Sequence, residues 1–243
     1  ILDVALLMET TDLDRVWILN PDGIVPAGTP GLLARAPSDF GLLGGRTFFH
    51  DPPDAIQVDG GRINRRTGVT SSLNQKRRHS AGNPVPFPAE ADIDYISGAH
   101  LCVSRLFWDK VGPMEEHYFL YYEEVDWAHR RGDLPLKALP EAAIFHRAGT
   151  SIGSASAKRR ASPMSVYFMN RARHLFMRRA YPGTWPWVWA YSLGKIGQLI
   201  LQRDLPAAGA LLRGAAGLKP PPSVRARLSA EALAAILAPE RTS

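Results

Sequence analysis

The chain has 243 residues, of which 45% are hydrophobic, so it can bury a sizeable core in one large domain or in one domain with an extension. Its formal net charge of +6 favours anionic partners, a class that includes phosphorylated ligands, nucleic acid and acidic membrane surfaces. The single cysteine, Cys102, excludes an intramolecular disulfide framework and a cysteine-rich zinc site, and its apolar neighbours favour a buried side chain.

The first strand is predicted over residues 15–19, and it stops at the Asn-Pro-Asp-Gly segment 20–23 because proline and glycine interrupt it. Asn20 and Asp22 are therefore one residue apart at a strand end, where both can face one hard cation such as Mg²⁺ or Mn²⁺ held against a diphosphate. An Asx turn is the open alternative, because the same four residues form such a turn well.

A short helix is predicted over residues 30–35 and a strand over 40–45. Residues 46–88 are rich in Gly, Pro, Asn, Asp and Arg and predict an extended loop or a hairpin, which either covers a substrate or is simply solvated. Strand character returns at 94–99, and residues 105–111 predict an amphipathic helix that ends at a Gly-Pro pair.

The apolar run at 118–122 leads without a turn residue into three carboxylates, Glu123, Glu124 and Asp126. We expect the run to be a short buried strand, which places the acids at a strand end, where ligand sites collect in sheets covered by helices. The open alternative places the acids in the first turn of a following helix, where the helix dipole stabilises each by about 0.3–1 kcal/mol.

Residues 136–146 predict two short strands around a central proline, the second of which ends in His146. A lone histidine there is usually structural and becomes a metal ligand only beside other ligands. Residues 167–179 alternate apolar and basic side chains at helical spacing, and two more helices are predicted over 207–218 and 230–237.

Three tryptophans and two tyrosines gather in the segment 181–191. Such a segment suits a membrane interface, and the basic runs at 158–160 and 178–179 would add attraction to anionic lipid. Packing against the rest of the chain and a homo-oligomer contact remain open alternatives. The helix predicted over 188–201 is interrupted by Lys195 and is shorter than the ~20 residues of a membrane span.

In this order the segments resemble those of family 2 glycosyltransferases, and the likeness is greatest to the rhamnosyltransferase and galactofuranosyltransferase-like branch. The resemblance covers roughly residues 1–179, and the combination of segments is far more specific than any one of them. The segments that carry it are Asn20-Pro21-Asp22 after a Val-Trp-Ile-Leu strand, Tyr95 to Ala99, Gly112, Tyr122 to Trp127, Arg130, Pro140 to Ala142, and Ile144 to His146.

The resemblance implies an α/β fold of the GT-A, Rossmann-like class, with a mixed sheet flanked by helices over residues 1–180 and a C-terminal helical extension over 181–243. Enzymes of this class begin with a strand and a helix that hold the nucleotide, and nothing before Val16 resembles that element. We therefore expect an N-terminally truncated form that lacks a βαβ unit of roughly 30 residues or more.

The resemblance also implies residue roles. Asp22 and His146 match ligands of a divalent cation that bridges the donor diphosphate, while Asn20 stands at the first position of the Asp-X-Asp element with an amide in place of a carboxylate. Glu124 matches the general base, here one methylene longer than the more common aspartate. Two neighbouring acids, Glu123 and Asp126, would orient the acceptor hydroxyl or the base. The residues that would contact the substrates are Ser97, Gly98, Trp127 and Arg130.

The function implied is an inverting, metal-dependent transfer of a sugar from a nucleotide-diphosphate donor to a hydroxyl of a glycan or polyprenyl-linked acceptor. Such a single displacement needs a carboxylate base and a hard cation at the leaving diphosphate, and the chain supplies residues of both kinds. We expect a cytoplasmic protein, with the inner face of the plasma membrane as an alternative location, acting in bacterial cell-surface polysaccharide synthesis and with no nucleic-acid partner. The alternative function is a non-catalytic basic module, a degenerate transferase, that binds an anionic membrane or nucleic acid.

Overall fold

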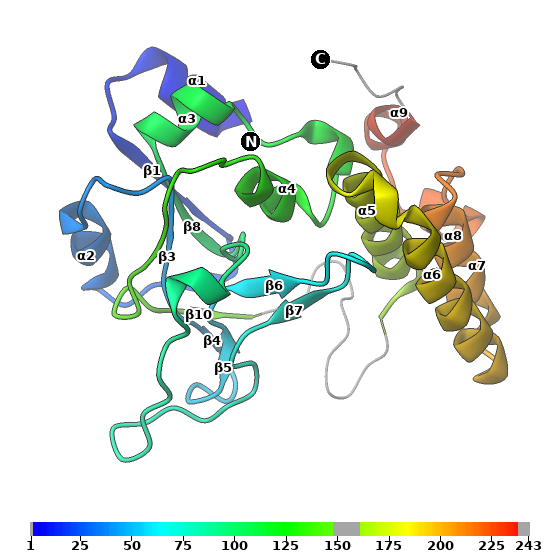
Figure 1. Ribbon diagram of the computed structural model, residues 1–243, viewed down its shortest axis with the longest axis horizontal. Coiled ribbons are helices and arrows are strands. Elements are labelled where there is room, and N and C mark those ends of the chain that lie inside the picture. The colour runs from blue at the N-terminus through cyan, green and yellow to red at the C-terminus, as the bar shows by residue number, and fades with distance from the viewer. Residues whose placement is uncertain (1, 148–160, 238–243) are drawn as a thin grey trace. The chain divides into compact units, whose positions relative to one another are not determined.

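The computed structural model describes residues 2–147 and 161–237, which separate into two compact units (Figure 1). The first unit comprises residues 2–63, 70–114 and 124–147 and contains the sheets. The second comprises 64–69, 115–123 and 161–237 and is mainly helical. The domain boundary predicted after residue 180 stays a prediction, and the basic run at 158–160 lies outside the described residues.

The sheets and the short helices around them make up most of the first unit. The helices are α1 (Leu2–Thr10), α2 (Thr29–Arg35), α3 (Arg105–Val111) and α4 (Glu123–His129), with a 3₁₀ turn at Glu90–Asp92. The strands are β1 (Arg15–Leu19), β2 (Gly23–Ile24), β3 (Leu42–Gly44), β4 (Thr47–Phe49), β5 (Ile56–Val58), β6 (Gly61–Ile63), β7 (Thr70–Ser72), β8 (His100–Ser104), β9 (Leu136–Ala138) and β10 (Ile144–His146).

Two four-stranded sheets share this unit. The first has the order β1-β8-β3-β9, in which β8 runs antiparallel to β1 and β3 while β9 runs parallel to β3. The second has the order β2-β10-β4-β5, with β10 parallel to β4 and antiparallel to β2. Helices α1 and α3 pack against β1 and β8 of the first sheet. The mixed α/β architecture is compatible with the predicted GT-A-like fold and confirms the predicted fold class.

The element boundaries follow from local chemistry. All five residues of β8 are buried, as expected of a strand covered on both faces. The strand ends at Ser104, whose Oγ accepts the N–H of Phe107 at 3.1 Å and so caps α3. Helix α3 ends at Gly112, whose φ of 75° suits a residue without a Cβ. The helix predicted over 105–111 is thus confirmed to the residue.

Gly45 lies between β3 and β4, where the chain passes from one sheet to the other, and its backbone packs closely against that of Ala142. A Cβ at this position would lie 2.1 Å from the carbonyl oxygen of Ala142 and 2.7 Å from Nε2 of His100. The imidazole of His100 spans the same junction, since Nδ1 accepts the indole N–H of Trp17 at 2.8 Å and Nε2 donates to the Ala142 carbonyl at 2.6 Å. Burial lowers the pKa of His100 to about 4, so the ring is neutral and its tautomer is fixed by these two partners.

The second unit is built on a long helix, α5 (Pro163–Ala180), which packs against α7 (Leu205–Ala215). A Cβ on Gly214 would lie 2.3 Å from the Tyr167 carbonyl oxygen, so the two helices pack too closely here for any residue larger than glycine. The remaining helices are α6 (Trp185–Leu201), α8 (Pro222–Arg225) and α9 (Ala230–Leu237), with 3₁₀ turns at Glu116–Tyr118 and Pro182–Thr184. The predicted C-terminal helices are confirmed, and none of the described helices is both long and apolar enough to span a bilayer.

A buried polar cluster joins α5 to α6. The hydroxyl of Ser192 donates to the Val188 carbonyl and receives hydrogen bonds from Arg173 at 2.8 Å and from Nε2 of His174 at 2.7 Å. Burial, reinforced by the charge of Arg173, lowers the pKa of His174 to about 3 and keeps the ring neutral. The guanidinium of Arg173 is therefore enclosed between the helices and is not part of a solvated face.

Two predicted strands are wrong. The run at 118–122 is a 3₁₀ turn followed by irregular backbone, because Phe119, Tyr121 and Tyr122 have φ values of 62°, 68° and 69°, which no extended strand accommodates. The segment 94–99 forms only one isolated bridge, between Gly61 and Tyr95. Strand β8 begins after it, at His100, where pairing with β1 starts.

The junction at Gly45 generates a stability prediction. Gly45→Ala should destabilise the protein by about 1–3 kcal/mol, because the added methyl meets a backbone carbonyl that cannot rotate away. The matched control is Gly82→Ala, since a Cβ at Gly82 meets no atom within 4 Å. Urea unfolding should show a lower midpoint for the first variant alone, and equal midpoints for both variants would show that the junction is not close-packed.

Candidate functional site

Strand pairing brings the polar ends of several strands to one place in the first unit. Asn20 follows β1, and its backbone N–H donates to the Ala99 carbonyl at 3.2 Å. Asp22 precedes β2, where Gly23 pairs with His146 at the end of β10 and the Asp22 carbonyl accepts the N–H of Arg147 at 3.3 Å. Residues more than 120 positions apart therefore meet through main-chain hydrogen bonds.

The side chains at this point form what we call the strand-end cluster, which consists of Asn20, Asp22, Gln57 and His146. Nε2 of His146 lies 2.9 Å from Oδ1 of Asp22 and 3.2 Å from Nδ2 of Asn20. Nδ1 of the same ring lies 3.0 Å from Oε1 of Gln57, which β5 contributes. The imidazole is nearly buried, whereas the Asp22 carboxylate is 30% exposed. The cluster is thus reachable from solvent on its carboxylate side.

These contacts constrain the protons on the ring of His146. Oε1 of Gln57 can only accept, so Nδ1 carries a proton that it donates to Gln57. Nε2 then either carries a second proton, shared with the Asp22 carboxylate, or presents a lone pair toward the same space. Because Nε2 and the carboxylate oxygen lie only 2.9 Å apart, both could contact one cation with little movement of the side chains.

The donor set of the cluster suits a hard or borderline divalent cation. One carboxylate, one imidazole and one amide offer oxygen and nitrogen ligands of the kind that Mn²⁺ and Mg²⁺ accept. Within residues 2–147 and 161–237, no three His, Cys, Asp or Glu side chains gather around a common point. A cation held here would thus take its remaining ligands from water or from a substrate oxygen.

Glu124 packs beside a short turn that also contacts the cluster. The turn is formed by residues 97–99, where Oγ of Ser97 accepts the N–H of Ala99 at 3.3 Å. A Cβ on Gly98 would lie 3.8 Å from Cβ of Glu124, so the glycine leaves room against this side chain. The same turn holds Asn20 through the Ala99 carbonyl. The predicted base and the predicted cation ligands therefore flank one turn.

Tyr95 lies close to the carboxylate of Glu124. Its pKa is raised, first by burial and then by the negative charge of Glu124, while a hydrogen bond with Thr70 acts in the opposite direction. The hydroxyl therefore stays protonated beside the charge of Glu124.

Asp126 and Trp127 of α4, with Arg130 just after its end, make contacts that link α4 to the segment 111–113. Asp126 is buried and binds Arg130 at 2.7 Å, and Arg130 also donates to the carbonyl groups of Val111 and Pro113 at 2.9 Å. The indole N–H of Trp127 donates to the Gly112 carbonyl at 2.8 Å. All three side chains are thus engaged in holding α4 to this loop, and their roles toward a substrate stay predictions.

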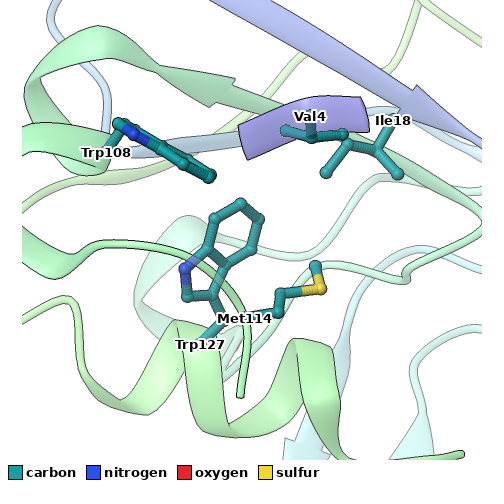
Figure 2. A pocket seen from close by; sticks show the side chains of 5 residues that line it. All are labelled: Val4, Ile18, Trp108, Met114 and Trp127. Atoms are coloured by element: carbon teal, nitrogen blue, oxygen red, sulfur yellow. The ribbon is translucent and has the colours of Figure 1, made fainter. Parts of the chain in front are cut away.

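A small apolar pocket lies beside Trp127 (Figure 2). Its volume is about 50 Å³, and it is lined by Val4, Ile18, Trp108, Met114 and Trp127. The two indole rings are arranged edge to face, with centroids 6.4 Å apart. None of the strand-end cluster lines this pocket, and its apolar walls offer no partner to a diphosphate.

Glu123 belongs to the second unit and differs from Glu124 in its surroundings. Its Oε2 is buried and finds no hydrogen-bond partner among the described residues, and burial raises the pKa of the carboxyl. The preceding backbone is strained at three residues with positive φ. Tyr122 anchors that backbone by donating to the Gly68 carbonyl at 2.5 Å, and Tyr121 by a 2.7 Å contact with Ser165. Backbone strain of this kind is more frequent at functional sites than elsewhere, and the role of the acidic stretch stays a prediction.

The sequence gives no signal for Gln57, and it does not predict the position of Tyr95 beside Glu124. Gln57 lies inside the segment 46–88, which predicts only a loop or hairpin, and its contact with His146 depends on pairing among β5, β4 and β10. Tyr95 lies in a predicted strand that does not form, so its position beside Glu124 follows from tertiary packing alone.

Comparison with known proteins supports a relationship to glycosyltransferases. The sequence matches no protein-family profile. It is 28% identical over 130 residues to the N-acetylglucosaminyl-diphospho-decaprenol L-rhamnosyltransferase of Mycobacterium tuberculosis, in both strain CDC 1551 and strain H37Rv. The match covers 52% of this chain and 39% of each relative, so the chain spans well under half the length of the curated relatives that it matches.

Proposed function

We propose that the chain carries the cation-binding and base-bearing part of an inverting, metal-dependent glycosyltransferase of the family 2, GT-A class. The observation that carries the proposal is the meeting of Asn20, Asp22 and His146 at the strand ends, with Glu124 across the turn 97–99. The similarity to a rhamnosyltransferase supports the same class of reaction.

The strand-end cluster would hold a divalent cation, Mn²⁺ or Mg²⁺. Asp22 and Nε2 of His146 would bind it directly, and the amide of Asn20 would turn its oxygen toward it or hydrogen-bond to the donor diphosphate. The cation supplies charge neutralisation at the leaving diphosphate. Because Asn20 contributes no charge, the protein offers the cation only one negative charge, which favours simultaneous binding of an anionic diphosphate.

Glu124 would act on the acceptor. In an inverting transfer the acceptor hydroxyl attacks the anomeric carbon, the bond from that carbon to the diphosphate oxygen breaks, and the hydroxyl proton passes to the base. Gly98 presents no side chain toward Glu124, so a sugar ring can approach the carboxylate over the turn. Tyr95, which stays protonated, would limit the positions that the carboxylate can adopt.

Gln57 would fix the tautomer of His146. A histidine that binds a metal through Nε2 must carry its proton on Nδ1, and Oε1 of Gln57 is placed to accept that proton at 3.0 Å. We assign Gln57 as a positioning residue, because it would act on the cation through His146.

The acceptor we propose is a hydroxyl of a polyprenyl-diphosphate-linked glycan, and the donor is a nucleotide-diphosphate sugar. The mycobacterial relatives are named for rhamnosyl transfer to N-acetylglucosaminyl-diphospho-decaprenol, which is an acceptor of this class. An acceptor of this kind would place the enzyme at the inner face of the plasma membrane, in the synthesis of a cell-surface polysaccharide.

Metal binding tests the cluster without any turnover. Mn²⁺ titration of the full chain, followed by electron paramagnetic resonance, should show one site that Asp22→Ala and His146→Ala abolish. Gln57→Leu should weaken it roughly 10- to 100-fold, whereas Gln57→Glu, which keeps the acceptor oxygen, should retain it. Gln202→Leu, on the exposed surface, is the matched control. Equal Mn²⁺ affinity in all of these proteins would show that the strand-end cluster is not the cation site.

The base is tested by an isosteric change. Glu124→Gln should lower turnover by roughly 10²–10⁴-fold and leave Mn²⁺ and donor binding nearly unchanged, because only the proton acceptor is lost. Glu116→Gln, an exposed carboxylate outside the site, is the control. Full activity in Glu124→Gln would reject this residue as base, and a larger loss in Glu123→Gln or Asp126→Asn would assign the role to that neighbour.

A further inference from the structure

Helix α6 presents an apolar face to solvent. Its exposed large side chains are Trp187, Leu193, Ile200 and Leu201, with exposed fractions of 60%, 57%, 50% and 87%. Their spacing at i, i+6, i+13 and i+14 places them on one side of a helix, together with the small exposed residues Ala190 and Gly194. The only charged residue of α6, Lys195, is partly buried and donates to Gln198. We call this surface the α6 outer face.

The opposite side of α6 is fixed to α5, so the outer face cannot turn inward. Val188 and Ser192 are fully buried, and Ser192 belongs to the polar cluster with Arg173 and His174. The rings of Trp185 and Trp189 stand edge-on to His174, with centroids 5.2 Å and 4.9 Å away. Of the three tryptophans predicted to share an interface, two are thus packed within this unit and Trp187 alone projects outward.

The C-terminal helices carry an excess of positive charge. Residues 161–237 contain ten Arg and Lys residues and two acidic residues, Asp204 and Glu231. Arg203, directly after α6, is exposed, and the next exposed leucine, Leu205, begins α7. An apolar face that ends beside an exposed arginine, on a segment with excess positive charge, is complementary to a lipid bilayer with an apolar interior and an anionic surface.

We propose that the α6 outer face binds the surface of an anionic lipid bilayer, with α6 lying parallel to the membrane plane. The side chains of Trp187, Leu193, Ile200 and Leu201 would enter the interfacial layer, while Arg203 would contact lipid phosphates. This inference deepens the proposed function, because a lipid-linked acceptor presents its sugar at the same surface. A second copy of the chain is the competing occupant, since Ala190 and Gly194 would permit close packing of two helices.

Vesicle flotation of the full chain tests the proposal. Wild type should float with vesicles of phosphatidylcholine and phosphatidylglycerol, and less with phosphatidylcholine alone or at high salt. The affinity of the double variant Leu193→Asp/Ile200→Asp for these vesicles should fall by roughly 10-fold or more, because its two carboxylates would have to enter the apolar interface. Leu106→Asp, at an exposed leucine of α3, is the matched control and should bind as wild type. The vesicles carry neither donor nor acceptor, so the outcome does not depend on glycosyl transfer.

A second measurement distinguishes lost contact with lipid from misfolding of the double variant. Brominated lipids should quench tryptophan fluorescence in wild type but less in Trp187→Phe, which keeps an aromatic ring at the same place. Absence of flotation in wild type, or equal flotation of the double variant, would overturn the proposal. A wild-type dimer that becomes a monomer in the double variant, with no vesicle binding by either, would assign the outer face to self-association.

Discussion

The candidate site depends on the pairing of β10 with β2, which carries His146 to Asp22. The two residues are 124 positions apart in sequence, yet the register that sets His146 opposite Gly23 leaves Nε2 only 2.9 Å from the Asp22 carboxylate. Every other feature of the site is arranged around that contact. The Ala99 carbonyl fixes Asn20, Gln57 faces the far nitrogen of the ring, and the turn that holds Ala99 also borders Glu124.

Buried polar groups have different structural roles in the two compact units. In the sheet-bearing unit the buried ring of His100 is neutral and hydrogen-bonded at both nitrogens, whereas the Asp22 carboxylate is 30% exposed and can meet a cation from solvent. In the helical unit the buried polar cluster around Ser192 sets the rotation of α6 about its axis. That rotation decides which side chains reach solvent, and it is why Trp187 is exposed while Trp185 and Trp189 are not.

Local patterns predicted much of this structure, since the helix at 105–111, the strand at 15–19 and the strand ending at His146 all form where the sequence places them. The closeness of Asn20 and Asp22 could also be predicted, because the two residues are only two positions apart in the sequence. What failed was the run at 118–122, whose apolar composition favours a strand but whose backbone adopts positive φ because tyrosine hydroxyls anchor it elsewhere. Gln57 was beyond prediction because its contact with His146 depends on strand pairing across three strands.

The most direct test of the central claim is the stereochemistry and metal dependence of transfer. The full-length protein should be incubated with a panel of nucleotide-diphosphate sugars and a polyprenyl-diphosphate-linked N-acetylglucosamine, and the product glycan analysed by NMR. The account predicts a single glycoside whose anomeric configuration is inverted relative to the donor, formed with Mn²⁺ or Mg²⁺ and lost in EDTA. A product with retained configuration, or equal transfer in EDTA, would contradict it.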